Sequence, residues 1–192
     1  MNASINDKIE TAYDYIYNDT QEALNIFNQI LETQPENIDA LNGKASALKK
    51  LNQIDQAEEI LKYSLTIKEN SSAYINLGLI YKNKKQFSEA LNNFDKAINV
   101  NPQLIDIVTI LKKEIFTNIG SNDYNKIGNY NKQANNLIYK GLSFEKEGEY
   151  WDAIECYELA LEKDLTSSNF VNALINNIRV NLQSDFIYDE MV

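Results

Sequence analysis

One segment of the chain, residues 71–102, constrains the fold most strongly, because its aromatic, small and helix-breaking residues recur at the spacing of a helical hairpin. Its distinguishing positions are Tyr74, Leu77, Gly78, Tyr81, Ala90, Phe94, Ala97 and Pro102. Gly78 and Ala90 are expected where the two helices of the hairpin cross, because larger side chains would push the helices apart. Pro102 cannot continue a helix and therefore marks the end of the unit. This pattern predicts a helix–turn–helix repeat of about 34 residues.

Further copies of the pattern occur along the chain. One copy comprises Leu137, Gly141, Phe144, Gly148, Tyr150, Ala153, Tyr157 and Ala160. A weaker copy comprises Leu41, Ala45, Leu48, Leu51, Ile54, Ala57, Leu61 and Ser64. A third lies near the start and comprises Ala12, Tyr15, Ala23, Phe27, Ile30 and Pro35. The interval from Ala12 to Ala23 is one residue shorter than that from Ala45 to Ala57, so the first hairpin turn should be tighter.

The copies recur at the same phase of the repeat. In this pattern the chain resembles the tetratricopeptide repeat family over most of its length. The resemblance implies an all-α fold, a right-handed α-solenoid of helix–turn–helix repeats with a C-terminal capping helix. We expect a single solenoid over residues 1–183, since one repeat cannot bury its apolar face alone. Its parts are expected at about 4–36, 38–69, 71–102, a degenerate unit 104–132, 134–165, a cap 167–183 and an acidic and apolar tail 184–192.

Two stretches depart from the repeat pattern. A helical stripe continues the stack near 104–117 and comprises Leu104, Val108, Leu111 and Ile115. The polar, glycine-containing stretch after it predicts a loop over 120–132. The capping helix is predicted from Phe170, Leu174, Ile178 and Leu182, which recur every four residues.

The charge balance limits the class of partner. The net charge is −10, with 18 basic residues, and Arg179 is the single arginine. Nucleic-acid affinity comes mostly from neutralisation of phosphates by lysine and arginine, so we expect no nucleic-acid partner. No apolar run approaches the roughly 20 residues that span a bilayer, and the N-terminus lacks the features of a signal peptide. We therefore expect a cytoplasmic protein with no membrane partner.

The chain offers few groups for catalysis or metal binding. It has no histidine, and Cys156 is its single cysteine. No zinc-ligand, phosphate-binding or dinucleotide-binding motif occurs. We expect no enzyme, no catalytic residue, no cofactor and no metal.

In tetratricopeptide proteins the first helices of successive units line a concave groove. The resemblance implies a partner-binding set of Asn42, Ser46, Lys49, Ile75, Leu79, Lys82, Ile138 and Leu142. Some co-chaperones of the family clamp a chain-terminal carboxylate with lysine, asparagine and arginine, but the matching places hold Ile9, Tyr13, Ser72 and Asn76. The chain departs from that subfamily.

An apolar floor is expected in the groove, formed by Ile75 with Leu79 and by Ile138 with Leu142. It predicts that the groove takes an apolar or amphipathic segment of a partner. Alternatively, these residues pack against the helix near 104–117 or the loop after it.

Lysines gather where first helices end, at Lys49, Lys50, Lys82, Lys84 and Lys85. Cations there complement the helix dipole, and they could also orient a partner electrostatically.

The function expected from these features is a non-catalytic scaffold or adaptor that binds a peptide or amphipathic helix of another protein in the groove. A structural, self-assembling solenoid is the alternative, and an enzyme is a remote one. The expected inner stripe of the first helix is Ile5, Ile9, Tyr13 and Ile16. Because the opposite face of that helix is polar, it should act as a cap and favour a monomer.

Overall fold

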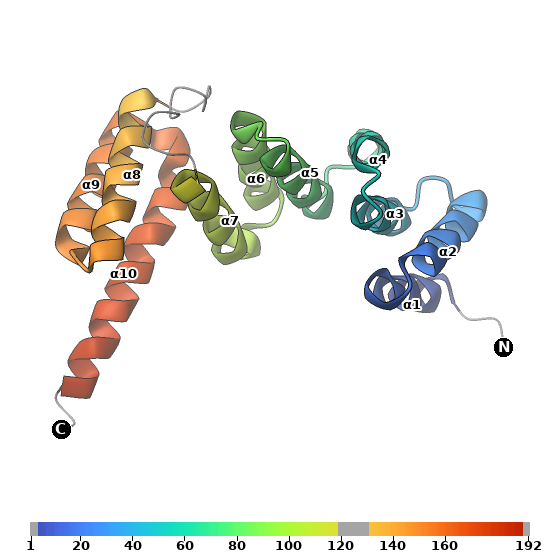
Figure 1. The fold of residues 1–192 in the computed structure, drawn as a ribbon, viewed down its shortest axis with the longest axis horizontal. Coiled ribbons are helices and arrows are strands. Elements are labelled where there is room, and N and C mark those ends of the chain that lie inside the picture. The colour runs from blue at the N-terminus through green and yellow to red at the C-terminus, as the bar shows by residue number, and fades with distance from the viewer. Residues whose placement is uncertain (1–3, 119–130, 190–192) are drawn as a thin grey trace. The chain divides into compact units, whose positions relative to one another are not determined.

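The computed structural model describes residues 4–118 and 131–189, and within these ranges the regular elements are all helices. The chain divides into two compact units, Met1–Asn101 (unit 1) and Pro102–Val192 (unit 2), each of which is drawn in Figure 1. The all-α fold is therefore confirmed. The expectation of one continuous stack over residues 1–183 stays a prediction.

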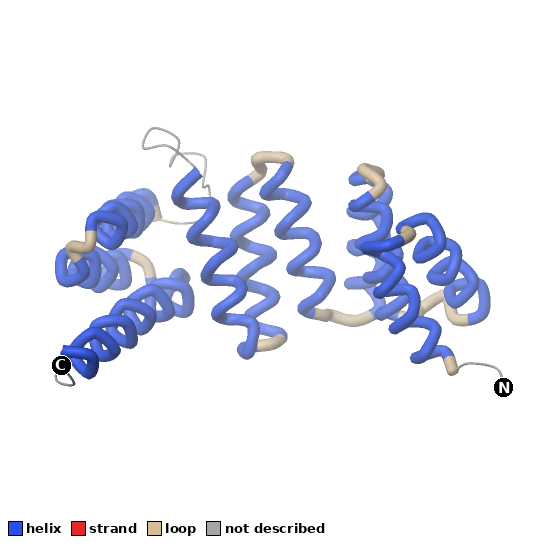
Figure 2. Tube along the Cα trace, turned by 60° about the horizontal axis from the view of Figure 1, so that its bottom comes forward, coloured by secondary structure: helices blue, strands red, loops and turns tan. Residues whose placement is uncertain are grey.

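Unit 1 consists of three helical hairpins. Its helices are α1 (Ile5–Asn18), α2 (Thr20–Thr33), α3 (Ile38–Lys50), α4 (Ile54–Ile67), α5 (Ser71–Asn83) and α6 (Phe87–Val100). The two helices of each hairpin pack against each other, and α2 packs on α3 as α4 packs on α5 (Figures 1 and 2). The first helix of each hairpin also contacts the first helix of the next, α1 with α3 and α3 with α5. These first helices form one layer, and the second helices α2, α4 and α6 form the other.

Polar side chains at the N-termini explain where several of these helices begin. Ser4 and Asp7 form a capping box, in which the Ser4 hydroxyl accepts from the Asp7 amide and the Asp7 carboxylate accepts from the Ser4 amide. Asn37 and Asn70 cap α3 and α5 through their side-chain oxygens. Such caps satisfy amides that have no partner within the helix.

The first hairpin turn is as tight as the sequence predicts. Asp19 alone separates α1 from α2, and it ends the first helix and caps the second. Its amide donates to the Tyr15 carbonyl at 2.8 Å, and its carboxylate accepts from the Glu22 amide at 3.1 Å. One residue therefore does the work that three residues do in each of the next two hairpins.

The other turns of unit 1 use a left-handed residue. Asn52 and Lys85 have φ angles of 62° and 59°. The residue after each donates to a carbonyl five positions earlier, Gln53 to Leu48 at 2.9 Å and Gln86 to Tyr81 at 2.8 Å. This is the hydrogen-bond pattern of a Schellman motif, which normally favours glycine at the left-handed position.

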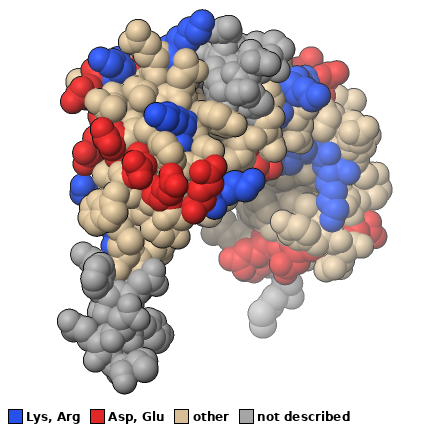
Figure 3. All heavy atoms as spheres, turned by 60° about the vertical axis from the view of Figure 1, so that its left-hand side comes forward, with Lys and Arg blue, Asp and Glu red and all other residues tan. Residues whose placement is uncertain are grey.

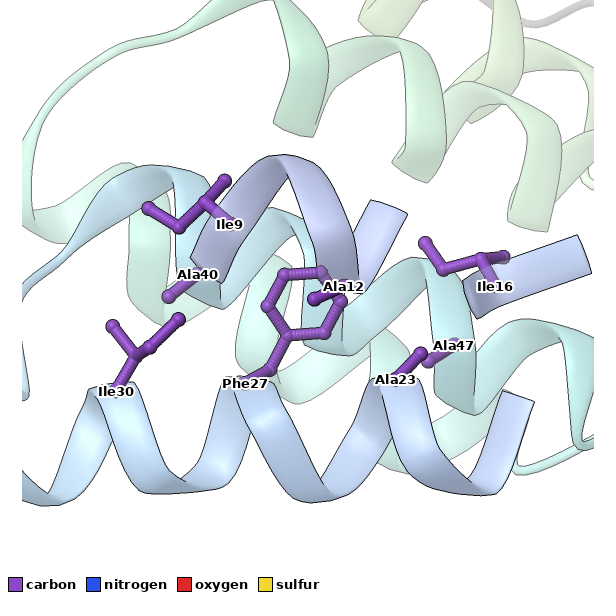
Figure 4. Close-up of a cluster of buried hydrophobic side chains, with 8 residues drawn as sticks. All are labelled: Ile9, Ala12, Ile16, Ala23, Phe27, Ile30, Ala40 and Ala47. Atoms are coloured by element: carbon purple, nitrogen blue, oxygen red, sulfur yellow. The ribbon is translucent and has the colours of Figure 1, made fainter. Parts of the chain in front are cut away.

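The core of unit 1 forms around aromatic rings that lie against small residues of the facing helices. Phe94 and Phe27 are fully buried. A methyl group at Gly78 would overlap the ring of Phe94, and one at Gly43 would overlap the ring of Phe27 from the preceding hairpin. Figure 4 shows Phe27 among side chains of three helices, namely Ile9, Ala12, Ile16, Ala23, Ile30, Ala40 and Ala47. The sequence pattern identified the first contact but not the role of Gly43 between hairpins.

Unit 2 contains a further hairpin and two helices that flank it. The 3-10 turn η1 (Pro102–Leu104) precedes α7 (Ile105–Asn118), and α8 (Lys132–Glu147) pairs with α9 (Tyr150–Lys163). The turn η3 (Leu165–Ser167) leads into α10 (Ser168–Asp189). Most of the loop expected at 120–132 lies outside the described residues. The last helix continues beyond residue 183, where the cap was expected to end.

The last helix packs against both α9 and α7. Its buried stripe comprises Phe170, Val171, Leu174, Ile175 and Ile178, as the four-residue spacing predicts. Phe170 stacks on Phe116 of α7, with ring centroids 5.4 Å apart and planes inclined by 11°. Within unit 2, α7, the helix of the degenerate repeat, therefore packs against α10, the last helix of the chain.

The left-handed turn at Lys85 yields a stability prediction. Replacing Lys85 with Gly should make the protein about 0.5–1 kcal/mol more stable than replacing it with Ala, because only the Ala variant keeps the Cβ that disfavours positive φ. Both variants lose the same charge, so urea unfolding of the pair isolates the backbone effect. Equal midpoints for the two variants would contradict the left-handed assignment.

The contact between Gly78 and Phe94 yields a second stability prediction. Gly78→Ala should cost about 1–2 kcal/mol, since overpacking against the ring outweighs the better helix propensity of alanine. Phe94→Leu makes room for the methyl group, so the double variant should lose less than the sum of the single losses. Chemical denaturation of the four proteins measures this coupling, and strictly additive losses would argue against direct contact.

Candidate functional site

A cavity of about 440 Å³ lies on the side of unit 1 formed by the first helices. All three first helices contribute to its lining, which comprises Tyr13, Ile16, Tyr17, Ser46, Lys49, Lys50, Asn76 and Asn83. The resemblance implied a groove lined by these same helices. Two residues of the expected binding set, Ser46 and Lys49, are among the lining residues.

Lys49 lies at the boundary between α3 and α5. Its ammonium donates to the Asn76 amide oxygen at 2.7 Å. Burial lowers the pKa of Lys49 below its ordinary value. In the described part of the chain, Lys49 forms no ion pair with a carboxylate. A half-buried cation that is bonded to a neutral amide retains an unfavourable desolvation cost.

Lys50, the next residue, reaches the opposite neighbour, α1. Its ammonium donates to the backbone carbonyls of Ile16 at 2.7 Å and Tyr17 at 3.3 Å, and it lies 4.8 Å from the centroid of the Tyr17 ring. These carbonyls are at the C-terminal end of α1 and have no partner within the helix. The Lys50 ammonium therefore both satisfies them and interacts favourably with the negative end of the helix dipole. The Tyr17 side chain is 82% exposed and is therefore available to a ligand.

Tyr13 forms a wall of the cavity, although the sequence placed it in the inner stripe of α1. Its side chain is 37% exposed, and the buried positions of that helix are Ile9, Ala12 and Ile16. The Tyr13 hydroxyl donates to the Asp39 carbonyl at 3.2 Å, and its ring meets Phe27 edge-on. Burial, with the charge of Asp39, raises the pKa of Tyr13 to about 12. The side chain is thus a neutral hydrogen-bond donor at neutral pH.

Asn42 is buried rather than presented to the groove. Its side-chain amide donates to Asn70 at 2.8 Å, and its oxygen accepts from the Ser64 hydroxyl at 3.2 Å. Asn70 in turn caps α5. The network joins the second hairpin to the start of the third, so in this structure Asn42 acts in packing.

The remaining members of the expected set lie apart from the cavity. Ile75, Leu79 and Lys82 are half-buried on α5 and do not line it. In unit 2, Ile138 is fully buried, and Leu142 is 5% exposed. Leu142 lines a smaller cavity of about 340 Å³ with Thr117, Tyr139, Ser143 and Lys146. Ile138 and Leu142 are therefore buried rather than presented at the surface of unit 2, and the apolar floor of the groove stays a prediction.

Sequence reasoning missed several lining residues. Tyr17 and Asn83 are at the last turns of their helices, and Ile16 was assigned to the core alone. Lys50 was noted as a helix-end lysine, and Asn76 as an isolated amide. The signal that could have found them is their common place near the C-terminal ends of first helices, where the lysines gather.

Lys84, which follows the end of α5, and Lys62 of α4 are neutralised by the chain itself. Lys84 pairs with Asp55 and Glu58, each at 2.8 Å, and Lys62 pairs with Glu58 at 2.6 Å. The Tyr81 hydroxyl also donates to Glu58, at 2.9 Å. Burial alone would raise the pKa of Glu58, but hydrogen bonds from these three partners outweigh it and lower the pKa to about 2. This cluster stabilises the packing of the second hairpin on the third.

The surface of unit 2 is acidic along α9. Exposed acidic residues follow the outer face of α9 and comprise Asp152, Glu155, Glu158 and Glu162. Figure 3 shows acidic side chains gathered over this part of the molecule. The described residues contain no cluster of acids and cysteine that could hold a metal ion.

Comparison with known families identifies the repeat. A family model described as tetratricopeptide repeat matches residues 16–77, and a second with the same description matches residues 71–104. The chain is a tetratricopeptide repeat protein. Together the matches cover all three hairpins of unit 1 and therefore the helices that line the cavity.

Solved structures of other tetratricopeptide proteins show the same fold. MamA aligns with a TM-score of 0.53 and 20% identity, covering 88% of this chain and 99% of that one. YrrB, described as "a TPR protein with an unusual peptide-binding site", aligns with a TM-score of 0.50 and 16% identity, covering 86% and 89% of the two chains.

One curated relative is the Protein STIP1 homolog of Dictyostelium discoideum, which is 24% identical over 169 residues. The alignment covers 78% of this tetratricopeptide protein and 28% of the relative, so the chain spans just over a quarter of that protein's length.

Within the described ranges, no helix is both long and apolar enough to span a bilayer. The cytoplasmic location, the monomeric state and the absence of a nucleic-acid partner stay predictions.

The Glu58 cluster predicts a pH-dependent stability. The pKa of Glu58 falls from 4.5 to about 2 on folding. Its contribution is therefore complete above about pH 5 and is lost as the pH falls toward 2. Glu58→Gln should cost about 1–2 kcal/mol near pH 7 after solvent screening, and much less near pH 3.

Urea unfolding at the two pH values measures this difference. Glu59→Gln, at an exposed site on the same helix, is the matched control and should follow the wild type throughout. A Glu58→Gln penalty of the same size at both pH values would show that the ionised cluster contributes nothing.

Proposed function

We propose that this tetratricopeptide protein is a non-catalytic interaction module that binds a segment of another protein in the cavity of unit 1. The observation that carries the proposal is the convergence of three first helices on one cavity of about 440 Å³. Its lining combines aromatic rings with side chains that donate hydrogen bonds, a combination typical of sites that orient a ligand. A volume of this size holds a few residues of a peptide.

The absence of catalytic machinery in the cavity supports a binding role. The titratable groups that line it are lysines and tyrosines, with no carboxylate or thiol among the lining residues. Lys49 is held by Asn76, and Lys50 by the end of α1. General acid–base catalysis needs a group that gains and loses a proton near the working pH, and Tyr13 has its pKa raised away from that range.

Similarity to known proteins also supports a peptide ligand. The structure of YrrB is described as having a peptide-binding site, and the helices of this chain follow the same fold. The curated relative matches this chain over only 28% of its own length, so it names no partner for this chain.

A peptide selection tests the proposal. The immobilised protein would be used to select binders from a displayed library of random peptides, in parallel with a Ser46→Trp variant. Ser46 is half-buried on the lining, so an indole there should fill part of the cavity and abolish binding of the selected peptides.

Ser72→Trp is the matched control, because Ser72 is exposed on α5 and does not line the cavity. Its binding should equal that of the wild type, and circular dichroism melting should show that both variants fold. Failure to select any peptide, or selection of peptides that bind Ser46→Trp equally well, would refute the proposed site.

A further inference from the structure

The cavity of unit 1 contains two ammonium groups that the chain does not neutralise. The Lys49 ammonium contacts an amide oxygen, and the Lys50 ammonium contacts two backbone carbonyls and an aromatic ring. Neither forms an ion pair with a carboxylate among the described residues. The cavity therefore has a positive potential that remains available to a ligand.

The chain as a whole is acidic, with 28 acidic and 18 basic residues. Four other basic residues that the structure describes are paired with carboxylates, namely Lys62, Lys84, Lys113 and Arg179. Lys49 and Lys50 lie in a cavity and have no carboxylate partner within the described part of the chain. A carboxylate of a ligand can therefore reach them there.

The two ammonium groups are held on opposite sides of α3. Asn76 of α5 fixes Lys49, whereas the last carbonyls of α1 fix Lys50. A ligand that meets both must therefore extend across α3, from α1 toward α5. Two carboxylates on one extended segment satisfy this geometry.

The rest of the lining suits the other parts of such a segment. Ile16 and the rings of Tyr13 and Tyr17 offer apolar surface for aliphatic groups, and Asn83 and Ser46 offer hydrogen bonds. Lysine ammonium groups act as point charges that suit carboxylates, whereas phosphate recognition favours the planar fork of arginine, and no arginine lines the cavity.

We propose that the cavity of unit 1 binds an internal acidic segment of a partner protein, whose side-chain carboxylates pair with Lys49 and Lys50. The inference rests on the proposed function and specifies the ligand of that same site. It differs from capture of a chain-terminal carboxylate, because the places that would form such a clamp hold Ile9, Tyr13, Ser72 and Asn76.

A carboxylate beside Lys49 relieves a cost that burial imposes on this lysine. Burial lowers the pKa of Lys49, which means that its charged form is destabilised in the free protein. An anion near it removes part of that cost, as an opposite charge within a few ångströms favours the charged form. Affinity should therefore weaken as salt is added, because the pairs form in a cavity that is open to solvent.

Fluorescence anisotropy with defined peptides tests the inference. The probe is a labelled peptide, acetylated and amidated at its ends, in which glutamate alternates with leucine and serine. An otherwise identical peptide with glutamine in place of glutamate is its control. The glutamate peptide should bind at least tenfold more tightly, which is about 1.4 kcal/mol.

Protein variants give the complementary measurement. Lys49→Gln with Lys50→Gln should weaken binding of the glutamate peptide at least tenfold, whereas Lys49→Arg with Lys50→Arg should retain most of it. Lys8→Gln with Lys68→Gln is the charge-matched control, because both residues are exposed and lie outside the cavity. Its affinity should change less than twofold.

Three outcomes would overturn the inference. The first is equal binding of the glutamate and glutamine peptides, which needs no protein variant and so does not depend on folding. The second is binding only when the peptide keeps a free C-terminal carboxylate, which would assign the cavity to chain ends. The third is self-association in sedimentation that the lysine-to-glutamine variant abolishes, which would assign it to a second copy.

These failures are distinguishable from failure of the proposed function. If selected peptides depend on Ser46 but are not acidic, the cavity binds peptides and only the inferred chemistry is wrong. If no peptide depends on Ser46, both proposals fail.

Discussion

The fold depends on the close approach of an aromatic ring to a glycine on a facing helix. Phe94 lies against Gly78 and Tyr157 against Gly141 within their hairpins, and each ring is fully buried. Burying such a side chain contributes roughly 2–3 kcal/mol, but only while the facing helix carries no side chain there. The ring therefore sets both the energy of a hairpin and the distance between its two helices.

The position of the unit 1 cavity follows from this packing. Because small residues and rings occupy the face of each first helix that meets its second helix, the opposite face is left for polar groups. Ser46 and Lys49 are three residues apart on that face of α3, and Asn76 and Asn83 are two turns apart on α5. Packing of the rings thus determines where the lysines stand, although the rings never touch the cavity.

The sequence predicted the features that depend on one hairpin and missed those that depend on several. The Asp19 turn and the stripe of α10 follow from local spacing, and both were predicted correctly. Gly43 was not, because its ring partner comes from the preceding hairpin. Ile138 has the spacing of a groove residue, but α8 contacts α7 as well as α9, and the side chain is buried.

Charge distribution, more than shape, distinguishes the cavity of unit 1. An acidic ligand of the kind proposed would meet a chain of net charge −10, which repels it within the Debye length. Glu58 and Asp55 pair with Lys62 and Lys84 within the fold, so these two lysines are neutralised by the chain itself. Among the residues that line the cavity, Lys49 and Lys50 carry positive charge, and neither is paired with a carboxylate of the described residues. If the cavity binds an acidic segment as proposed, the excess of acid in the chain favours specificity, because a ligand has to gain enough from Lys49 and Lys50 to offset the general repulsion.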